Sequence, residues 1–202
     1  MSVENISDSR GRALEQIRAE VVNLKGSPLF AYRQQNKYLP VIGSGDTRAK
    51  IMFVGEAPGR NEAKTGLPFC GAAGKILDKM LAGAGIKREE VYITNIVKDR
   101  PQENRDPGPE EIKIYGPFLD RQIEIIQPKI IATLGRYSMR YILDKLGAGV
   151  PGNIGDLHGK RFKVQASYGP IEIAVLYHPA VAVYNPSMLA ALQKDFRILH
   201  PI

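Results

Sequence analysis

Four short apolar segments, rich in valine and isoleucine, recur along this chain and constrain its fold more than any other feature. They are Lys50–Val54, Val91–Asn95, Lys129–Leu134 and Glu172–Tyr177. Their apolar residues run mostly without interruption instead of alternating with polar ones, which is typical of parallel strands buried on both faces. We therefore expect one parallel sheet built from these four segments.

Segments with helical periodicity separate the apolar runs. The first precedes the sheet, at about Ser7–Leu24, where Leu14, Ile17, Val21 and Leu24 form an apolar stripe. The others are Ala73–Ala84, Pro109–Ile126, Tyr137–Leu146 and Ser187–Leu199. Right-handed crossovers between the strands then predict an α/β fold, a three-layer α/β/α sandwich with a central, mainly parallel four-stranded sheet.

Two further segments complete this prediction of the fold. Arg161–Ala166 alternates apolar and polar residues and predicts an added edge strand or hairpin. Gly147–Gly155 contains four glycines and one proline and predicts a mobile loop. With 202 residues, of which 44% are hydrophobic, the chain is expected to form a single domain over residues 1–202.

Charge and cysteine content narrow the choice of partners and cofactors. The 28 Lys and Arg residues against 21 Asp and Glu give a net charge of +7, which favours polyanions such as nucleic acid, although the same side chains can simply solvate helices. No apolar stretch is long enough for a bilayer and the N-terminal residues lack a signal-peptide core, so we expect a cytoplasmic protein with no membrane partner. A lone cysteine, Cys70, cannot by itself hold zinc or an iron–sulfur cluster, so no cofactor is expected.

The loop after the first apolar run, Gly55–Gly59 (GEAPG), is rich in glycine and carries a carboxylate. Because the carboxyl ends of parallel strands meet at one edge of a sheet, the loops after the first, second and fourth runs are expected to share a ligand pocket. The side chains that converge there are Glu56, Glu62, Phe69, Asn95 and His178.

Two common phosphate-binding motifs are excluded at this loop. A P-loop requires Ser or Thr after its glycine and lysine, but Gly74-Lys75 is followed by Ile76. No G-x-G-x-x-G dinucleotide motif follows the first strand either. The pocket therefore needs another interpretation.

Four ordered motifs of the chain resemble the family 4 uracil-DNA glycosylases. They are Gly55–Gly59 (GEAPG), Thr65–Gly74 (TGLPFCGAAG), Thr94–Pro101 (TNIVKDRP) and His178–Ala180 (HPA). The resemblance runs from about Val22 to the C-terminus. It implies a DNA repair enzyme, a monofunctional glycosylase that flips uracil out of DNA and hydrolyses its N-glycosidic bond to leave an abasic site.

The resemblance also implies which side chains bind the flipped base. Phe69 would stack on it, the carboxamide of Asn95 would match uracil O4 and N3–H and reject cytosine, and His178 would act in catalysis by donating a hydrogen bond to O2. Each residue also has a structural interpretation when taken alone. Phe69 can be a core residue, Asn95 can cap a turn, and His178 can be an ordinary loop histidine.

The carboxylates and the glycine-rich loop are given roles by the same resemblance. Glu56 would be catalytic, placing the attacking water or stabilising the sugar cation, and Glu62 would shape the pocket or exclude the methyl group of thymine. The backbone of Ala57, Pro58 and Gly59 would close on the base or its phosphate.

The expected partner is uracil-containing DNA, single- or double-stranded, bound by a monomer. Lys98, Arg100 and Arg105 flank the second loop and are candidates for phosphate contacts, although a solvated basic rim explains them equally well. Tyr184, in an apolar stretch after the histidine motif, is the candidate for a side chain that wedges into the base stack.

The chain departs from the family at the positions of its iron–sulfur cluster. Family 4 enzymes typically carry four cysteines that hold a 4Fe–4S cluster, and the matching positions here are Leu24, Ser27, Asp99 and Tyr115. The cluster is therefore expected to be absent, with packing and polar contacts in its place.

Two other activities remain open at this point. One is a broader glycosylase that removes hypoxanthine or other deaminated bases. The other is a protein that binds uracil-DNA without turnover, although the segment 102–106 lacks the histidine found in superfamily members that trap the abasic sugar covalently.

Overall fold

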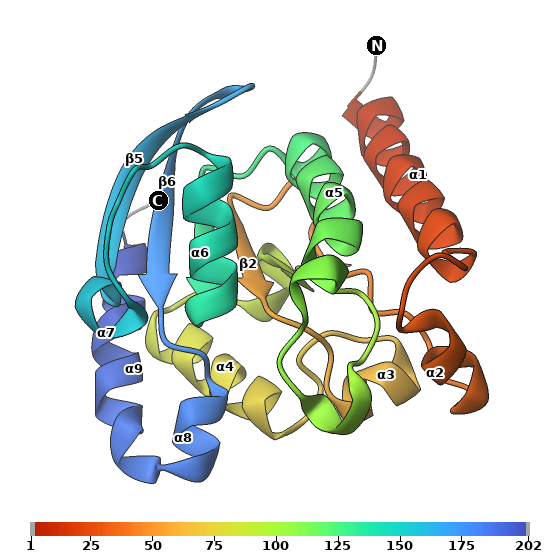
Figure 1. The fold of residues 1–202 in the computed structure, drawn as a ribbon. Helices are drawn as coiled ribbons and strands as arrows, with labels where there is room; N and C mark the ends of the chain where they lie inside the picture. The colour runs from red at the N-terminus through yellow and green to blue at the C-terminus, as the bar shows by residue number, and fades with distance from the viewer. Residues whose placement is uncertain (1–2, 201–202) are drawn as a thin grey trace.

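A six-stranded sheet forms the centre of the molecule, with the strand order β1-β3-β2-β4-β6-β5. The computed structural model describes the backbone of residues 3–200 and the side chains of residues 9–200. Strands β3, β2, β4 and β6 are parallel, and the edge strands β1 and β5 are antiparallel to their neighbours (Figure 1). The strands are β1 Ser44–Gly45, β2 Ile51–Gly55, β3 Tyr92–Asn95, β4 Ile130–Leu134, β5 Lys160–Ala166 and β6 Gly169–Leu176.

Helices connect the strands and cover both faces of the sheet. They are α1 Val3–Val22, α2 Phe30–Gln35, α3 Arg60–Thr65, α4 Ala72–Gly83, α5 Pro109–Ile126, α6 Arg136–Lys145, α7 Ile154–Leu157, α8 Ala180–Tyr184 and α9 Leu189–Phe196. Short 3-10 turns occupy Arg88–Glu90, Gln102–Asn104, Pro186–Met188 and Arg197–Leu199.

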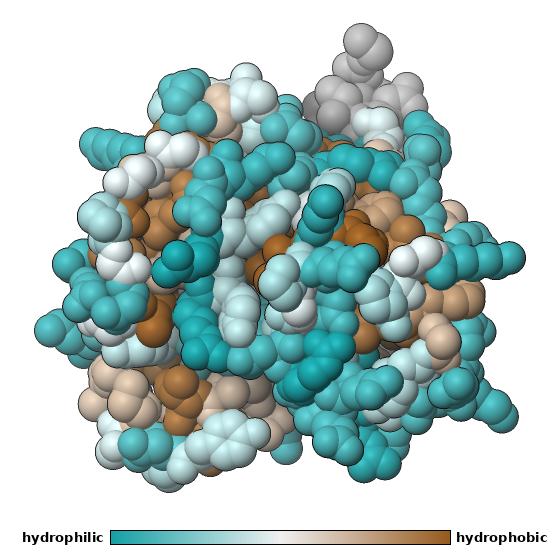
Figure 2. All heavy atoms as spheres, viewed as in Figure 1, coloured by the Kyte–Doolittle hydropathy of each residue, from teal (hydrophilic) through white to brown (hydrophobic). Residues whose placement is uncertain are grey.

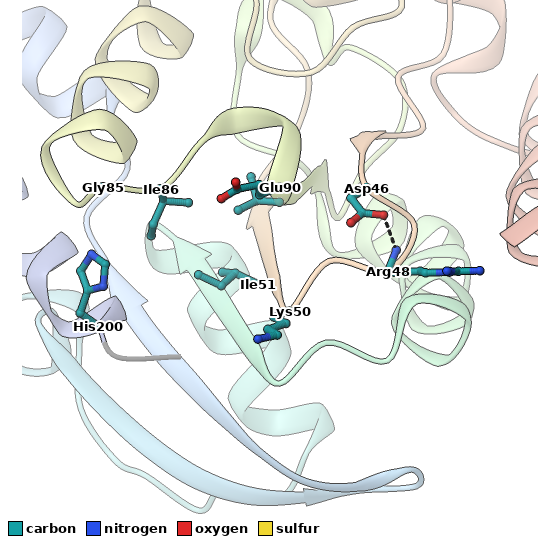
Figure 3. Close-up of a pocket in the computed structure, with 9 residues that line it drawn as sticks. Asp46, Arg48, Lys50, Ile51, Gly85, Ile86, Glu90 and His200 are labelled. Carbon is teal, nitrogen blue, oxygen red and sulfur yellow. Dashed lines mark hydrogen bonds between the residues drawn. The ribbon is translucent and has the colours of Figure 1, made fainter. Parts of the chain in front are cut away.

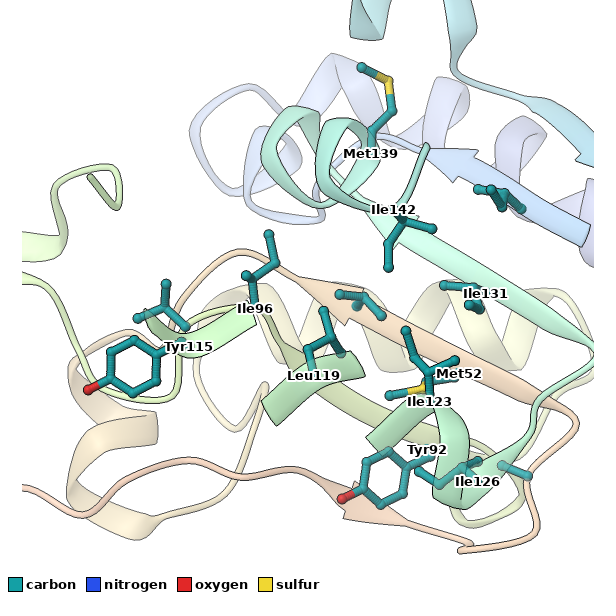
Figure 4. Packing of buried hydrophobic residues seen from close by; sticks show 14 of the residues in the cluster. Met52, Tyr92, Ile96, Tyr115, Leu119, Ile123, Ile126, Ile131, Met139 and Ile142 are labelled. Atoms are coloured by element: carbon teal, nitrogen blue, oxygen red, sulfur yellow. The ribbon is translucent and has the colours of Figure 1, made fainter. Parts of the chain in front are cut away.

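Side chains of β2 alternate between two apolar cores, one on each face of the sheet. Met52 and Val54 pack into the core formed with α1, α5 and α6, which Figure 4 shows around Met52 and Leu119. Ile51 and Phe53 pack into the second core, formed with α4 and α9. Because both faces of the strand are covered, its sequence is continuously apolar, and each fully buried side chain of this size contributes roughly 1.5–3 kcal/mol.

The predicted α/β fold and its parallel strands are confirmed, and the sheet is larger than expected. The four predicted strands form its parallel centre, and Lys160–Ala166 pairs with β6 as the expected hairpin. The four-stranded count is corrected to six because β1 also pairs with β3. A strand of two residues has no periodicity for a sequence pattern to reveal.

The predicted helices are present, but the last one is interrupted. The segment 187–199 consists of α9 between two 3-10 turns, and helices α2, α3, α7 and α8 were not predicted because each has at most six residues. Residues 148–153 form neither helix nor strand. No helix of the described residues is long and apolar enough to cross a membrane, and Figure 2 shows a face dominated by hydrophilic side chains.

Candidate active site

The pairing of β2 with β3 brings two of the predicted site loops together at the carboxyl edge of the sheet. Gly55, the last residue of β2, is paired with Asn95, the last residue of β3. The pairing continues past both strands, because the backbone N–H of Val97 donates to the carbonyl of Glu56 at 3.0 Å. Strand β6 ends at Leu176, so His178 reaches the same edge.

A cavity of about 370 Å³ opens at this edge, within the range of small-molecule sites. Its lining residues come from the loops after β2, β3 and β6 and from the helices that follow them. They are Glu56, Ala57, Gly59, Glu62, Phe69, Ala73, Asn95, Asn104, Asp106, His178, Ala180 and Tyr184. The predicted residues of the base pocket therefore surround one cavity, except that Pro58 is buried and is not among the lining residues.

Phe69 lies against the imidazole of His178, with 5.6 Å between the ring centroids. Its backbone has a φ of +49°, a left-handed conformation that is uncommon for a bulky residue and occurs often at functional sites. The chain fits around it only because residue 74 is glycine, since a Cβ there would lie 1.9 Å from the Phe69 carbonyl oxygen. The ring of Phe69 is thus held at the cavity by its backbone.

Two charged side chains hold the loop that carries Phe69. Glu62 Oε1 accepts hydrogen bonds from the backbone N–H groups of Cys70, at 3.0 Å, and Gly71, at 2.8 Å. On the other side, Arg88 donates to the carbonyl oxygens of Pro68 and Phe69. Glu62 therefore shapes the pocket through the backbone of this loop.

Asn95 presents a hydrogen-bond acceptor that no protein group uses. Its side-chain Oδ1 is buried and has no hydrogen-bond partner, although the residue is only 2% exposed and lines the cavity. Buried polar atoms are nearly always paired, so an orphaned one at a cavity points to a ligand. Gly55 leaves the room that this amide needs, because a Cβ there would lie 2.3 Å from Oδ1 and 2.9 Å from the ring of Phe69.

His178 is neutral, with its proton on a defined nitrogen. Burial lowers the pKa of its imidazole to about 4, against the opposing effect of Glu62. Its Nδ1 accepts a hydrogen bond from the backbone N–H of Ala180 at 3.1 Å. A neutral imidazole that accepts at Nδ1 carries its proton on Nε2, so His178 can donate a hydrogen bond without being charged.

Glu56 is a carboxyl group that titrates near neutral pH. Burial and, after it, the negative charge of Asp106 raise its pKa to about 7, against the opposing effect of Arg136. Asp106 is held by α6, where Arg136 pairs with its carboxylate and the hydroxyl of Tyr137 donates to Oδ2 at 2.9 Å. A carboxyl group with such a pKa can accept a proton from water at physiological pH.

Sequence reasoning missed two polar residues of the cavity, Asn104 and Asp106. Both lie in the loop after β3, where Glu103 and Asn104 have left-handed φ values of +54° and +56°. The sequence signalled a polar loop here, but the contacts that place its residues at the cavity, from Arg100 to Asn104 and from α6 to Asp106, depend on the fold.

Two of the predicted phosphate contacts are wrong. Lys98 is 0% exposed, and its ammonium group lies in the interior. Arg100 is 9% exposed, and its guanidinium group donates to Asn104 and to the hydroxyl groups of Tyr32 and Tyr38. Both side chains are occupied inside the protein, so neither is available to DNA in this structure.

The other two predicted DNA-binding residues lie at the surface. Arg105 forms two hydrogen bonds with the carboxylate of Glu111, at 2.6 and 3.0 Å, yet its side chain is 49% exposed. Tyr184 ends α8 beside the cavity and is 88% exposed. An aromatic side chain so exposed at the rim of a cavity is placed to meet a ligand that projects from it.

The four positions at which the family resemblance implies cysteines form a different kind of cluster. The hydroxyl groups of Tyr115 and Ser27 lie 2.7 Å apart, and the Tyr115 hydroxyl donates to Asp99 Oδ2 at 2.7 Å. Arg33 pairs with Asp99 Oδ1 at 3.2 Å, and Leu24 packs against the apolar core. We call Ser27, Arg33, Asp99 and Tyr115 the polar clip, since it joins the end of α1, α2, the loop after β3 and α5.

The polar clip does not fit an iron–sulfur cluster. Such a cluster is held mainly by cysteine thiolates, and these positions offer none. Their oxygen atoms are also already bonded to one another. Among the described residues, no group of three or more His, Cys, Asp and Glu side chains is placed to hold a metal ion.

A second cavity, of about 460 Å³, lies at the opposite edge of the sheet, where β2 and β3 begin (Figure 3). It is lined by the charged side chains Asp46, Arg48, Lys50 and Glu90 together with aliphatic residues and His200. None of the described residues that line it carries a carboxamide or a phenyl ring, the groups that would read a base and stack on it.

Comparison with known proteins defines the class. Residues 42–199 match the model of the uracil DNA glycosylase superfamily, and the chain belongs to this superfamily. Its relatives include type-4 uracil-DNA glycosylases. That of Sulfurisphaera tokodaii is 46% identical over 186 residues, 92% of this chain and 82% of the relative. The enzyme of Saccharolobus solfataricus is 44% identical over 186 residues, which are 91% of this chain and 83% of the relative. The enzyme of Archaeoglobus fulgidus is 40% identical over 185 residues, which are 92% of this chain and 90% of the relative.

Proposed function

We propose that this protein is a monofunctional uracil-DNA glycosylase of DNA repair, which hydrolyses the N-glycosidic bond of uracil in DNA and leaves an abasic site. Its membership of the superfamily supports this reaction. The observation that carries the proposal within the structure is the unpartnered Oδ1 of Asn95, in a cavity that also holds an aromatic ring and a neutral imidazole.

Asn95 supplies the selectivity for uracil. Its free Oδ1 can accept a hydrogen bond from N3–H of uracil, while the amide nitrogen donates to O4. Cytosine has no proton on N3 and carries a donor at its 4-position, so the same amide would meet an acceptor with an acceptor and a donor with a donor. A mismatch of this kind in a buried site gives strong discrimination.

Phe69 binds the face of the flipped base, and His178 stabilises the charge that develops on it. The ring of Phe69 provides a stacking surface, an interaction worth about 1–3 kcal/mol when such a ring is truncated. His178 donates from Nε2 to O2, where negative charge develops as the C1′–N1 bond breaks and its electron pair moves onto the base. Removing one such donor typically costs about 10²–10³ in rate.

Glu56 completes the reaction on the sugar. In its ionised form it accepts a proton from the water whose oxygen bonds to C1′, and its charge stabilises the positive sugar in the transition state. Asp106 acts through Glu56 because its charge raises the pKa of that carboxyl group.

The surface residues of the rim contact DNA in this proposal. Tyr184 enters the space that the flipped nucleotide leaves in the base stack, and Arg105 approaches a phosphate. The net charge of +7 favours the polyanion. We further propose a monomer that acts in the cytoplasm on single- or double-stranded DNA.

The enzyme works without an iron–sulfur cluster in this proposal, because the polar clip occupies the cluster positions. Protein purified in the absence of added iron is expected to contain no stoichiometric iron and to keep full activity in the presence of chelators. An iron–sulfur chromophore whose removal abolishes excision would contradict the proposal.

The test of the activity is excision from an oligonucleotide that contains one uracil, revealed by alkaline cleavage of the abasic site. Wild-type protein should give the product, and Asn95→Ala should not. An exposed substitution away from the cavity, Lys194→Ala, serves as the control. No cleavage by the wild-type protein, under conditions where a known glycosylase works, would reject the proposed activity.

A further inference from the structure

Lys98 is a fully buried lysine whose ammonium group is bonded only to neutral oxygen atoms. Its side chain is 0% exposed. Nζ donates to the backbone carbonyl of Asn95 at 2.6 Å, to Gln122 Oε1 at 2.6 Å and to Thr94 Oγ1 at 2.9 Å. No carboxylate is among these partners, so the desolvation of the charge is not offset by an ion pair.

The protons of the neighbouring groups show that all three partners are acceptors. The carbonyl of Ile42, at 2.6 Å, is nearer to the Thr94 hydroxyl than an alternative acceptor, Gln122 Oε1, at 3.2 Å, and a proton donated to Ile42 leaves Oγ1 free to accept. The amide nitrogen of Gln122 donates to the same carbonyl at 2.9 Å and to Tyr92, so Oε1 is its acceptor. A protonated amine has three donors, which matches three acceptors, whereas a neutral amine has two.

The three acceptors around Nζ favour the protonated form of Lys98 and oppose the effect of its burial. Burial lowers the pKa of the ammonium well below its ordinary value. Burial of the ammonium group costs free energy, and Lys98 has no role at the surface, so we look for a role inside the protein. Its contact with Asn95, whose side chain lines the base cavity, supplies that reason.

We propose that Lys98 is a positioning residue for uracil recognition, which fixes the peptide of Asn95 and thereby aims its carboxamide at the base. The bond reaches Asn95 at the last residue of β3, the position from which its side chain lines the cavity. On the cavity side, the carboxamide occupies the space that the missing side chain of Gly55 leaves free. Lys98 confines the same residue from behind, through its main chain. The inference rests on the proposed role of Asn95.

The decisive variant is Lys98→Met, which keeps an unbranched side chain of similar length and removes the three donors. Three quantities are measured on it: single-turnover excision of uracil, affinity for free uracil, and affinity for DNA that carries an abasic-site analogue. Excision should fall about 10²-fold, because a small misplacement of a positioned group has effects of this size. Affinity for free uracil should fall about tenfold, the equivalent of one lost hydrogen bond.

Affinity for the abasic DNA should stay within about twofold, since this ligand has no base for Asn95 to read. Tyr115→Phe is the matched control, because it destabilises the buried polar clip without touching Lys98 or Asn95. It should leave all three quantities unchanged at a temperature where it is folded. A Lys98→Met protein with wild-type excision and uracil affinity would overturn the inference, and so would one whose three quantities fall together.

Two further measurements distinguish a failure of this inference from a failure of the proposed role of Asn95 and from misfolding of Lys98→Met. Asn95→Ala that excises uracil normally would refute the proposed role of Asn95, whatever Lys98→Met does. If Lys98→Met does not fold, the inference is tested on the wild-type protein. Labelled with ¹⁵N-lysine, it should show one slowly exchanging ammonium resonance that shifts when free uracil saturates the site. A resonance unmoved by uracil would overturn the inference.

Discussion

The hydroxyl group of Tyr115 is the centre of the polar clip, and its removal tests whether this clip stabilises the fold. The hydroxyl donates to Asp99 Oδ2 at 2.7 Å and lies 2.7 Å from Ser27 Oγ, while Tyr115 and Asp99 are 0% and 1% exposed. Burial raises the pKa of Asp99, and the hydrogen bond from Tyr115 is the largest effect that opposes it. Tyr115→Phe removes that oxygen and keeps the ring.

The magnitude follows from the two hydrogen bonds that are lost. A bond to a charged group contributes about 1.5–3 kcal/mol and a neutral one about 1 kcal/mol, so Tyr115→Phe should lower the free energy of unfolding by about 3 kcal/mol. For a chain of this size, each kcal/mol corresponds to a Tm change of about 2–4 °C. The expected decrease in Tm is therefore about 6–12 °C.

Thermal unfolding followed by circular dichroism measures this effect, and Tyr141→Phe provides a matched control. The Tyr141 hydroxyl donates to Asp120 at 2.9 Å, but that carboxylate is 22% exposed and keeps its ion pair with Lys145. This variant should lose less than about 1 kcal/mol. Equal Tm decreases for the two variants would refute the reasoning, because the hydroxyl in the clip would then contribute no more than that of the partly buried Tyr141.

The remaining predictions concern the cavity. The rate of uracil excision should fall as pH is lowered through about 7, because Glu56 takes up a proton there. In Asp106→Asn this fall should move to lower pH, because the removal of a like charge lowers the pKa of Glu56. An unshifted pH profile in this variant would exclude the effect of Asp106 on Glu56. Since burial raises the pKa of Glu56 from 4.5 to about 7, its contribution to stability is lost as pH rises through about 7, and Glu56→Gln should have a higher Tm than wild type at pH 8 but not at pH 4. Gly55→Ala should reduce excision about 10²-fold, because its Cβ would lie 2.3 Å from Asn95 Oδ1; wild-type kinetics in this variant would show that the amide needs no such space.

The sequence predicted the parallel strands, the hairpin and the longer helices because each has enough residues for a periodic pattern. Residues 109–126 show this directly, since the predicted and observed bounds of α5 are the same. Strand β1, with two residues, and helix α3, with six, are too short for such a pattern. Tertiary contacts hold these short elements in place, and a single sequence does not display them.

The base pocket was predictable for a different reason. Glu56, Phe69, Asn95 and His178 follow apolar strands whose ends must meet, so their convergence follows from the topology. Lys98 was placed wrongly because composition shows a charge but not its burial.

The polar clip was foreseen only in part. The sequence shows that the cluster cysteines are absent from Ser27, Asp99 and Tyr115, and polar contacts were expected in their place. That Arg33 extends from α2 to pair with Asp99 depends on the packing of distant segments. Such a contact has no signature in the local sequence.

The structure of this protein with free uracil tests the central claim most directly. The account predicts that the base stacks on Phe69, that its N3–H donates to Asn95 Oδ1, and that its O2 accepts a hydrogen bond from His178 Nε2. Uracil bound in the cavity at the opposite edge of the sheet, with Asn95 Oδ1 still unpartnered, would contradict it.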